Sequence, residues 1–216
     1  MSAGRLVLLR HGRTAWNDTG RLQGRSDVPL DDVGQRQAVA AAATLRDPAP
    51  ALVLSSDLRR AHDTARVLAH ASGAPLRTDP RLRERDFGAW EGLTGDRIAA
   101  TWPDAYAAWR RGDEPVEMAA EARAAVGHRV AAAVTDAVGC VADGGTLVVV
   151  GHGGALSTAM AALLGMTPGE WFGVYAMGNG RWSVLEPNPR REPAWRLRRH
   201  DVAPDAGAAC SDLATG

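Results

Sequence analysis

The chain has 216 residues, with 25 acidic and 25 basic side chains, so its formal net charge at neutral pH is zero. A balanced charge does not suggest a nucleic-acid or membrane surface. All of the basic residues are arginine, which excludes Schiff-base and lysine-base mechanisms. Any binding of an anion by basic side chains would have to use arginine.

Strands and helices alternate along the sequence. Short apolar runs predict strands at 6–9, 52–54, 75–78, 147–150, 182–185 and 195–198. Periodicity and capping residues predict helices at 33–45, 58–70, 121–138 and 155–164. We expect loop with short helices at 83–113, and disorder in the small, polar tail 203–216. This alternation predicts an α/β fold with a mostly parallel central sheet, in a single domain over residues 1–202.

The sequence shows no targeting or membrane-spanning segment. Its first predicted strand begins almost at Met1, which leaves no room for a signal sequence. No apolar run approaches the roughly 18 residues that a membrane span needs. We therefore expect a cytoplasmic protein.

Two predicted strands end at a histidine beside glycine, in Arg10-His11-Gly12 and in Gly151-His152-Gly153. Because ligands bind beyond the carboxyl ends of the strands in an open α/β sheet, we expect both imidazoles in one crevice. Neither histidine has a partner at metal-ligand spacing, and Arg10 would repel a cation, so a zinc site is disfavoured. An adjacent arginine, close glycines and a following helix N-terminus instead predict a bound phosphate.

Four blocks of the sequence, in order, resemble the histidine phosphatase superfamily, the phosphoglycerate-mutase-like enzymes. The blocks are Arg10-His11-Gly12 with the segment 14–30 after it, then 55–65, 82–92 and Gly151-His152-Gly153. The resemblance implies a three-layer α/β/α sandwich in which residues 83–120 contribute a cap over the site. It also implies a phosphohistidine mechanism that uses no metal and no other cofactor.

The resemblance implies a role for each matching residue. His11 is the expected nucleophile, with its other ring nitrogen bonded to a glycine carbonyl. Glu84 is the expected general acid, a role that suits a carboxyl group that is buried or close to other carboxylates. Arg60, rather than Arg59, directly precedes the motif alanine and is the expected phosphate clamp. Arg10, Arg60 and His152 are expected to surround the phosphate, and the expected substrate-binding residues are Thr14, Asn17, Gln23, Gly24 and Gly153.

The same blocks favour a phosphatase over a mutase. The mutase-like pattern has a lysine soon after the position of Gly92, whereas this chain continues Leu93-Thr94 and contains no lysine. The chain most resembles the actinobacterial glucosyl-3-phosphoglycerate phosphatases. This resemblance implies that the substrate is glucosyl-3-phosphoglycerate or a related sugar or glycerate phosphate. Where those enzymes have Gly-Gly-Glu-Ser before the long helix, this chain has Ala119-Ala120-Glu121-Ala122. Since alanine favours helix over glycine, we expect the helix to extend backwards.

Two alternative functions stay open. One is a cofactor-dependent phosphoglycerate mutase, and the other is a binding module that recognises phosphorylated ligands without turnover. A binding module is expected to lose the nucleophile, a clamp arginine or the acid, and this chain retains all three. The expected partner is a small phosphorylated substrate. We expect no binding to nucleic acid or to a membrane, and a homodimer stays open as an assembly.

Overall fold

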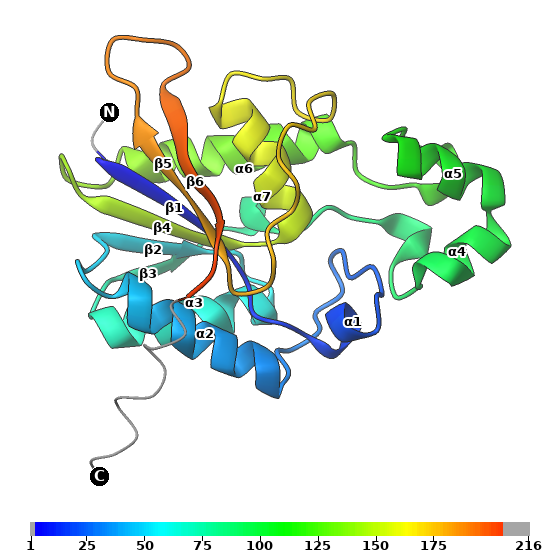
Figure 1. Ribbon diagram of the computed structural model, residues 1–216, viewed down its shortest axis with the longest axis horizontal. Coiled ribbons are helices and arrows are strands. Elements are labelled where there is room, and N and C mark those ends of the chain that lie inside the picture. Colours follow the sequence, from blue (N-terminus) through cyan, green and yellow to red (C-terminus); the bar gives the residue numbers. More distant parts are fainter. Residues whose placement is uncertain (1–2, 205–216) are drawn as a thin grey trace.

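One mixed sheet of six strands forms the centre of the molecule (Figure 1). The structure is a computed structural model and describes residues 3–204. The strand order is β3-β2-β4-β1-β5-β6, in which β3, β2, β4 and β1 run parallel and the β1–β5 and β5–β6 pairs are antiparallel. The strands are β1 (Arg5–Arg10), β2 (Leu52–Ser55), β3 (Leu76–Thr78), β4 (Thr146–Gly151), β5 (Trp182–Pro187) and β6 (Trp195–Val202). The predicted α/β fold with a mostly parallel sheet is confirmed.

The two central strands, β1 and β4, are buried on both faces. Every residue from 6 to 9 and from 147 to 150 is at most 1% exposed. Unbroken runs of Leu and Val are typical of parallel strands that helices cover on both sides. The register pairs Arg10 with Gly151, so the chain leaves the sheet at His11 and at His152 side by side.

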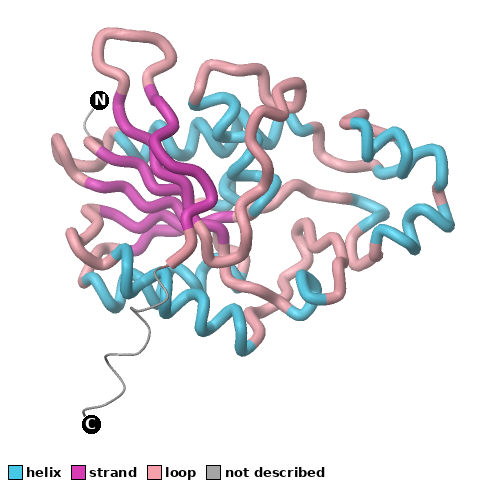
Figure 2. Tube along the Cα trace, in the orientation of Figure 1, coloured by secondary structure: helices cyan, strands magenta, loops and turns pink. Residues whose placement is uncertain are grey.

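Helices cover both faces of the sheet, which gives the predicted three layers (Figure 2). On one face, α2 (Asp32–Leu45) and α3 (Arg59–Ser72) pack against Val7 and Leu9. On the other, α6 (Arg123–Val138) and α7 (Gly153–Leu163) pack against Leu6 and Leu8. The valines that recur every four residues in α6 form its buried stripe, as the periodicity predicts: Val126, Val130, Val134 and Val138.

Residues 83–120, here called the cap segment, lie beyond the carboxyl ends of the parallel strands (Figure 1). The segment contains α4 (Gly95–Thr101), α5 (Pro103–Arg111) and the 3-10 helices Gly88–Trp90 and Val116–Met118, and another 3-10 helix, Pro80–Leu82, precedes it. Its own apolar cluster is built around the fully buried Trp90. The rings of Trp102, Tyr106 and Trp109 pack on that indole. The cap segment is therefore a packed lobe rather than an open loop.

The expected backward extension of α6 is wrong. The helix begins at Arg123, and residues 119–122 lie outside it. Ala119 has a φ of 48°, in the left-handed region, which a right-handed helix cannot include. The backbone N–H of Glu121 donates to the carbonyl of Asp86, and its carboxylate accepts a hydrogen bond from Nε of Arg129. These contacts outweigh the helix preference of alanine.

Two helix starts also differ from the sequence prediction. A short helix, α1 (Ala15–Asp18), forms between the predicted strand 6–9 and the predicted helix 33–45, where no helix is predicted. Thr14 and Asn17 form a capping box there, each side chain accepting from the backbone N–H of the other. Helix α7 starts at Gly153, two residues before the predicted start, because the extended residue His152 already serves as its N-cap.

No helix within residues 3–204 is both long and apolar enough to cross a membrane. The predicted disordered tail at 203–216 lies outside the described residues, apart from its first two positions.

Candidate active site

His11 stands at the end of β1, with its ring held by the following residue. Its backbone N–H donates to the carbonyl of Gly151 at the end of β4, at 3.0 Å. Its Nδ1 lies 2.6 Å from the carbonyl oxygen of Gly12, as predicted. A carbonyl oxygen only accepts hydrogen bonds, so Nδ1 carries the proton and Nε2 keeps its lone pair. The imidazole is thus held in the tautomer that a nucleophile needs.

His152 lies against His11, as the matching strand ends predict. The two ring centroids are 5.2 Å apart in an edge-on arrangement. Nε2 of His152 lies 2.9 Å from the hydroxyl oxygen of Ser56, which follows β2. Nδ1 of His152 is buried and has no hydrogen-bond partner among the described residues. Its capacity to form a hydrogen bond is therefore unused by the described residues.

Arg60 and Arg10 are held by backbone carbonyls. Nη1 and Nη2 of Arg60 donate to the carbonyls of Ser26 and Gly24, each at 2.7 Å. Nη1 of Arg10 donates to the carbonyl of Met177 at 2.6 Å. Within residues 3–204, the Nε atoms of both arginines are buried without a partner. Two fixed positive charges with spare donors suit the oxygens of a phosphate.

The electrostatics keep both imidazoles neutral. Burial lowers the pKa of His11 well below its ordinary value, and the charges of Arg60 and Arg10 lower it further. Burial also lowers the pKa of His152 strongly, with Arg60 as the next cause. A neutral His11 with a free lone pair is a competent nucleophile at neutral pH.

Glu84 reaches the same crevice from the start of the cap segment and is 8% exposed. Its carboxylate accepts hydrogen bonds from the backbone N–H groups of Gly154 at 3.0 Å and Ala155 at 2.8 Å, in the first turn of α7. The N–H of Arg85 also donates to it, at 2.8 Å. A helix N-terminus is a favourable place for a carboxylate. The side chain is therefore fixed beside the helix that follows His152.

Glu91, a competing carboxylate nearby, is occupied elsewhere. It accepts from the backbone N–H groups of Arg25, Ser26 and Phe87 and from the Ser26 hydroxyl. Residues 24–26 include both carbonyls that hold Arg60. Glu91 therefore supports the loop that holds Arg60, which leaves Glu84 as the better placed candidate for the acid.

The predicted substrate-binding side chains form a connected layer. Thr14 is fully buried, and its hydroxyl lies 3.0 Å from Oε1 of Gln23. The side-chain amide of Asn17 accepts from Nδ2 of Asn179 at 3.2 Å. Asn179 also donates to the backbone carbonyl of His11 at 3.1 Å. The layer thus supports the loop that carries His11.

The two predicted glycines are sites of close approach to other groups of the site. A Cβ on Gly24 would lie 1.9 Å from Oε1 of Glu91, and the φ of Gly24 is +52°. A Cβ on Gly153 would lie 3.3 Å from the guanidinium of Arg10. A side chain at either position would displace a group that holds or forms the candidate phosphate site.

The supporting roles of three residues were not predicted from the sequence: Ser56, Asn179 and Glu91, of which Glu91 was considered only as a carboxylate competing with Glu84. Ser56 and Glu91 lie inside blocks that resemble the superfamily, so a signal was present for them, whereas Asn179 lies outside the four blocks. Their partners, His152, His11 and the 24–26 loop, are far away along the chain. Sequence spacing gives no information on such pairings.

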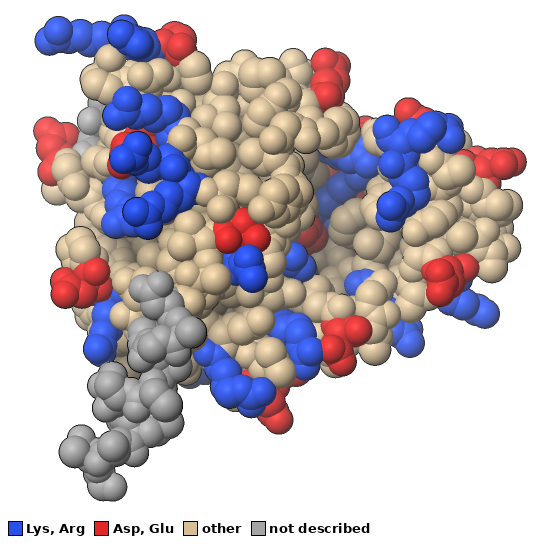
Figure 3. Space-filling model, in the orientation of Figure 1, with Lys and Arg blue, Asp and Glu red and all other residues tan. Residues whose placement is uncertain are grey.

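A hollow separates the cap segment from the sheet, and basic side chains lie inside it (Figure 3). A pocket on this side is lined by Trp109, Arg110 and Gly112 of the cap segment, and by Arg123 and Phe172 from opposite it. Positive side chains in a hollow raise the local concentration of anionic ligands. Among residues 3–204, no group of three or more His, Cys, Asp or Glu side chains is placed to hold a metal ion.

Residues 6–201 match the Histidine phosphatase superfamily (branch 1). The chain is 40% identical over 211 residues to a glucosyl-3-phosphoglycerate phosphatase of Mycolicibacterium vanbaalenii, covering 91% of this chain and 94% of that protein. It is 36% identical over 166 residues to a probable phosphoglycerate mutase of Yersinia pestis, covering 74% and 75%. A solved structure of mycobacterial glucosyl-3-phosphoglycerate phosphatase with VO3 superposes with a TM-score of 0.84 at 39% identity, covering 92% of this chain and 99% of that one.

Proposed function

Because the chain belongs to branch 1 of the histidine phosphatase superfamily, we propose that it hydrolyses phosphate monoesters through a phosphohistidine on His11. The family and the relatives make the chain a phosphatase; the route and the substrate are the proposal. The main support for His11 as the nucleophile is the 2.6 Å contact between its Nδ1 and the carbonyl oxygen of Gly12. It leaves Nε2 with a lone pair in a buried site beside two arginines.

Two steps follow from this geometry. First, Nε2 of His11 attacks phosphorus, and the N–P bond forms as the bond from phosphorus to the leaving oxygen breaks. Glu84, in its protonated form, gives its proton to that oxygen. Then water gives a proton to Glu84 while its oxygen bonds to phosphorus and the N–P bond breaks. Inorganic phosphate leaves, and both residues return to their starting states.

Arg10, Arg60 and His152 provide the electrostatic part of the mechanism. The charge in phosphoryl transfer spreads over the three equatorial oxygens, and fixed donors stabilise it without reorganising. The unpartnered Nε atoms of both arginines and Nδ1 of His152 are available for those oxygens. We propose that these groups replace the metal ion that many other phosphatases use.

We propose glucosyl-3-phosphoglycerate as the substrate. The support is the relative of that name, at 40% identity over almost its whole length. A mutase is the second candidate, because a probable phosphoglycerate mutase is also similar at 36% identity. The lack of lysine favours hydrolysis, since the mutase-like pattern places one after Gly92.

A phosphate-release assay tests this proposal. The substrates are glucosyl-3-phosphoglycerate, 3-phosphoglycerate, other sugar phosphates and p-nitrophenyl phosphate, each with and without EDTA. We expect the highest kcat/KM on glucosyl-3-phosphoglycerate and no loss with EDTA. A higher kcat/KM on an unrelated phosphate ester would show that glucosyl-3-phosphoglycerate is not the preferred substrate. Loss of all activity with EDTA, restored by a divalent cation, would contradict the metal-independent route.

A further inference from the structure

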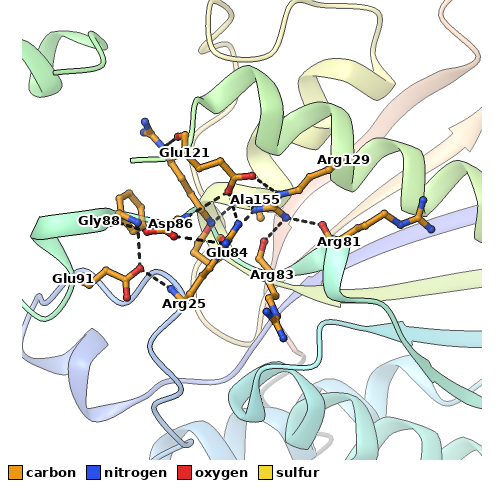
Figure 4. Close-up of polar contacts among 12 residues, drawn as sticks. Arg25, Arg81, Arg83, Glu84, Asp86, Gly88, Glu91, Glu121, Arg129 and Ala155 are labelled. Carbon is orange, nitrogen blue, oxygen red and sulfur yellow. Dashed lines mark hydrogen bonds and ion pairs between the residues drawn. The ribbon is translucent and has the colours of Figure 1, made fainter. Parts of the chain in front are cut away.

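Arg129 on α6 uses all of its donors on the segment that carries Glu84 and on one carboxylate (Figure 4). Nη1 donates to the carbonyls of Arg81 and Arg83 at 2.6 and 2.7 Å, and Nη2 to the carbonyl of Glu84 at 3.1 Å. Nε and Nη2 also donate to Oε1 and Oε2 of Glu121, at 2.7 and 2.8 Å. A guanidinium has five N–H groups, so none is left over. Lysine, with one nitrogen, cannot reproduce this pattern.

Glu84 is consequently held from two helices. Its carboxylate accepts from the N–H groups of Gly154 and Ala155 on α7, and its backbone carbonyl accepts from Arg129 on α6. The residue itself lies in neither helix nor strand. Its position beside His152 therefore depends on these side-chain and backbone contacts.

Glu121 extends the connection to the phosphate clamp. Its Oε2 accepts from Nη2 of Arg25 at 3.3 Å. Arg25 lies between Gly24 and Ser26, whose carbonyls hold Arg60. One carboxylate thus contacts both the arginine that holds the acid and the loop that holds the clamp. Burial raises the pKa of Glu121, but the hydrogen bonds and charge of Arg129 outweigh it and keep the pKa low.

We propose that Arg129 and Glu121 are positioning residues, which hold Glu84 where it can protonate the leaving oxygen and couple it to the loop that holds Arg60. The inference rests on the proposed role of Glu84 as general acid. It goes beyond that role because neither residue touches the phosphate site itself. A purely structural pair would stabilise the fold without favouring one kind of substrate.

The test compares two leaving groups. p-Nitrophenolate leaves with little protonation, whereas the alkoxide of 3-phosphoglycerate needs a proton from the acid. The variants are Arg129→Lys and Glu121→Gln. We expect each to lose about 10- to 100-fold in kcat on 3-phosphoglycerate, a part of the range for general acid catalysis, and less than about threefold on p-nitrophenyl phosphate.

Asp136→Asn is the matched control. Asp136 lies on the same helix and pairs with the side chain of Arg81 at 2.8 Å, but it is 67% exposed and, within residues 3–204, forms no hydrogen bond or ion pair with Glu84. It should leave both rates unchanged. Thermal unfolding of every variant measures the structural contribution separately. Equal losses on both substrates would show a structural role and overturn the inference.

Glu84→Gln separates this inference from the proposed function. If Glu84→Gln lowers kcat by the same factor on both substrates, the proposed role of Glu84 as the acid is wrong. If it shows the leaving-group difference and Glu121→Gln and Arg129→Lys do not, only the positioning role is wrong. In the double variant Glu84→Gln with Glu121→Gln, the second change should add no further leaving-group effect, because both residues belong to one hydrogen-bond network through Arg129 and their effects are coupled. Should Arg129→Lys not fold, Glu121→Gln alone decides the outcome.

Discussion

The hydroxyl oxygen of Ser56 lies 2.9 Å from Nε2 of His152, and both residues are fully buried. The same oxygen accepts from the backbone N–H of Leu58 at 3.3 Å, so its proton is free to point at the imidazole. We infer that Ser56 donates to Nε2 of His152, which places the imidazole proton on Nδ1, the buried atom without a partner in the described part of the chain. In this tautomer, Nδ1 is the donor that would face a bound phosphate.

We predict that Ser56→Ala lowers kcat about tenfold, the effect of losing roughly 1.4 kcal/mol of transition-state stabilisation. The measurement is kcat on p-nitrophenyl phosphate, together with the nitrogen chemical shifts of His152. Ser72→Ala is the control, since the Ser72 hydroxyl also donates a hydrogen bond, but to the backbone carbonyl of Leu68 within α3. An unchanged tautomer in Ser56→Ala would contradict the argument.

His11→Ala should abolish both turnover and the acid-labile phosphoenzyme, because no other side chain at the end of β1 offers a lone pair. Acid quenching during turnover, with detection of protein-bound phosphate, measures the intermediate. His70→Ala, on the exposed side of α3, should retain wild-type activity. Near wild-type turnover by a folded His11→Ala protein would rule out the covalent route.

Stability should fall as the pH drops below the ordinary histidine value. His11 and His152 have folded pKa values well below 6.5, chiefly because they are buried. Below 6.5 the unfolded chain binds protons that the folded chain does not, so unfolding becomes more favourable. Above 6.5 both states are neutral, and these groups cause no change. Below pH 6.5 and above its folded pKa, each histidine lowers the free energy of unfolding by up to about 1.36 kcal/mol per pH unit.

Urea unfolding of the wild type and of His152→Gln, from about pH 8 to about pH 5, measures this effect. The variant should show a shallower decline below 6.5, since it has one buried histidine fewer. An identical pH dependence in the two proteins would mean that His152 titrates normally when folded.

Gly24→Ala should remove most activity. A Cβ there would lie 1.9 Å from Oε1 of Glu91, and the carbonyl of Gly24 holds Arg60. Gly20→Ala is a matched control, because Gly20 also has a positive φ, +66°, but a Cβ there would meet nothing within 4 Å. Both variants should lose about 1 kcal/mol of stability from the left-handed backbone, and only Gly24→Ala should lose activity as well. Equal kcat and KM values in the two proteins would show that the loop containing Gly24 does not position Arg60 for catalysis.

Hydrolysis should exceed isomerisation on 3-phosphoglycerate. A mutase must keep water out and hold a second phosphate, and the chain has no lysine for the position after Gly92. Phosphorus NMR of one reaction mixture follows inorganic phosphate and 2-phosphoglycerate together, with 2,3-bisphosphoglycerate added to prime any mutase. Faster formation of 2-phosphoglycerate than of phosphate would move the chain to the mutase branch.

Local pattern was sufficient for the sheet and for the two histidines. Runs of Leu and Val at 6–9 and 147–150 predict buried parallel strands, and parallel strands bring their carboxyl ends together. The proximity of His11 and His152 could therefore be predicted from local pattern, whereas the bond of His11 to a glycine carbonyl was predicted from the resemblance to the superfamily. The catalytic roles of these residues stay predictions until the variants are measured.

Tertiary structure decided the supporting contacts. Ser56 meets His152 across 96 positions of sequence, and Arg129 meets the carbonyl of Glu84 across 45. Such contacts depend on how helices pack on the sheet, which residue spacing does not encode. The start of α6 shows the same limit. Alanine at 119 and 120 favours helix, but Glu121 is held by Arg129 and the cap segment, and several tertiary hydrogen bonds outweigh a propensity of less than about 1 kcal/mol per residue.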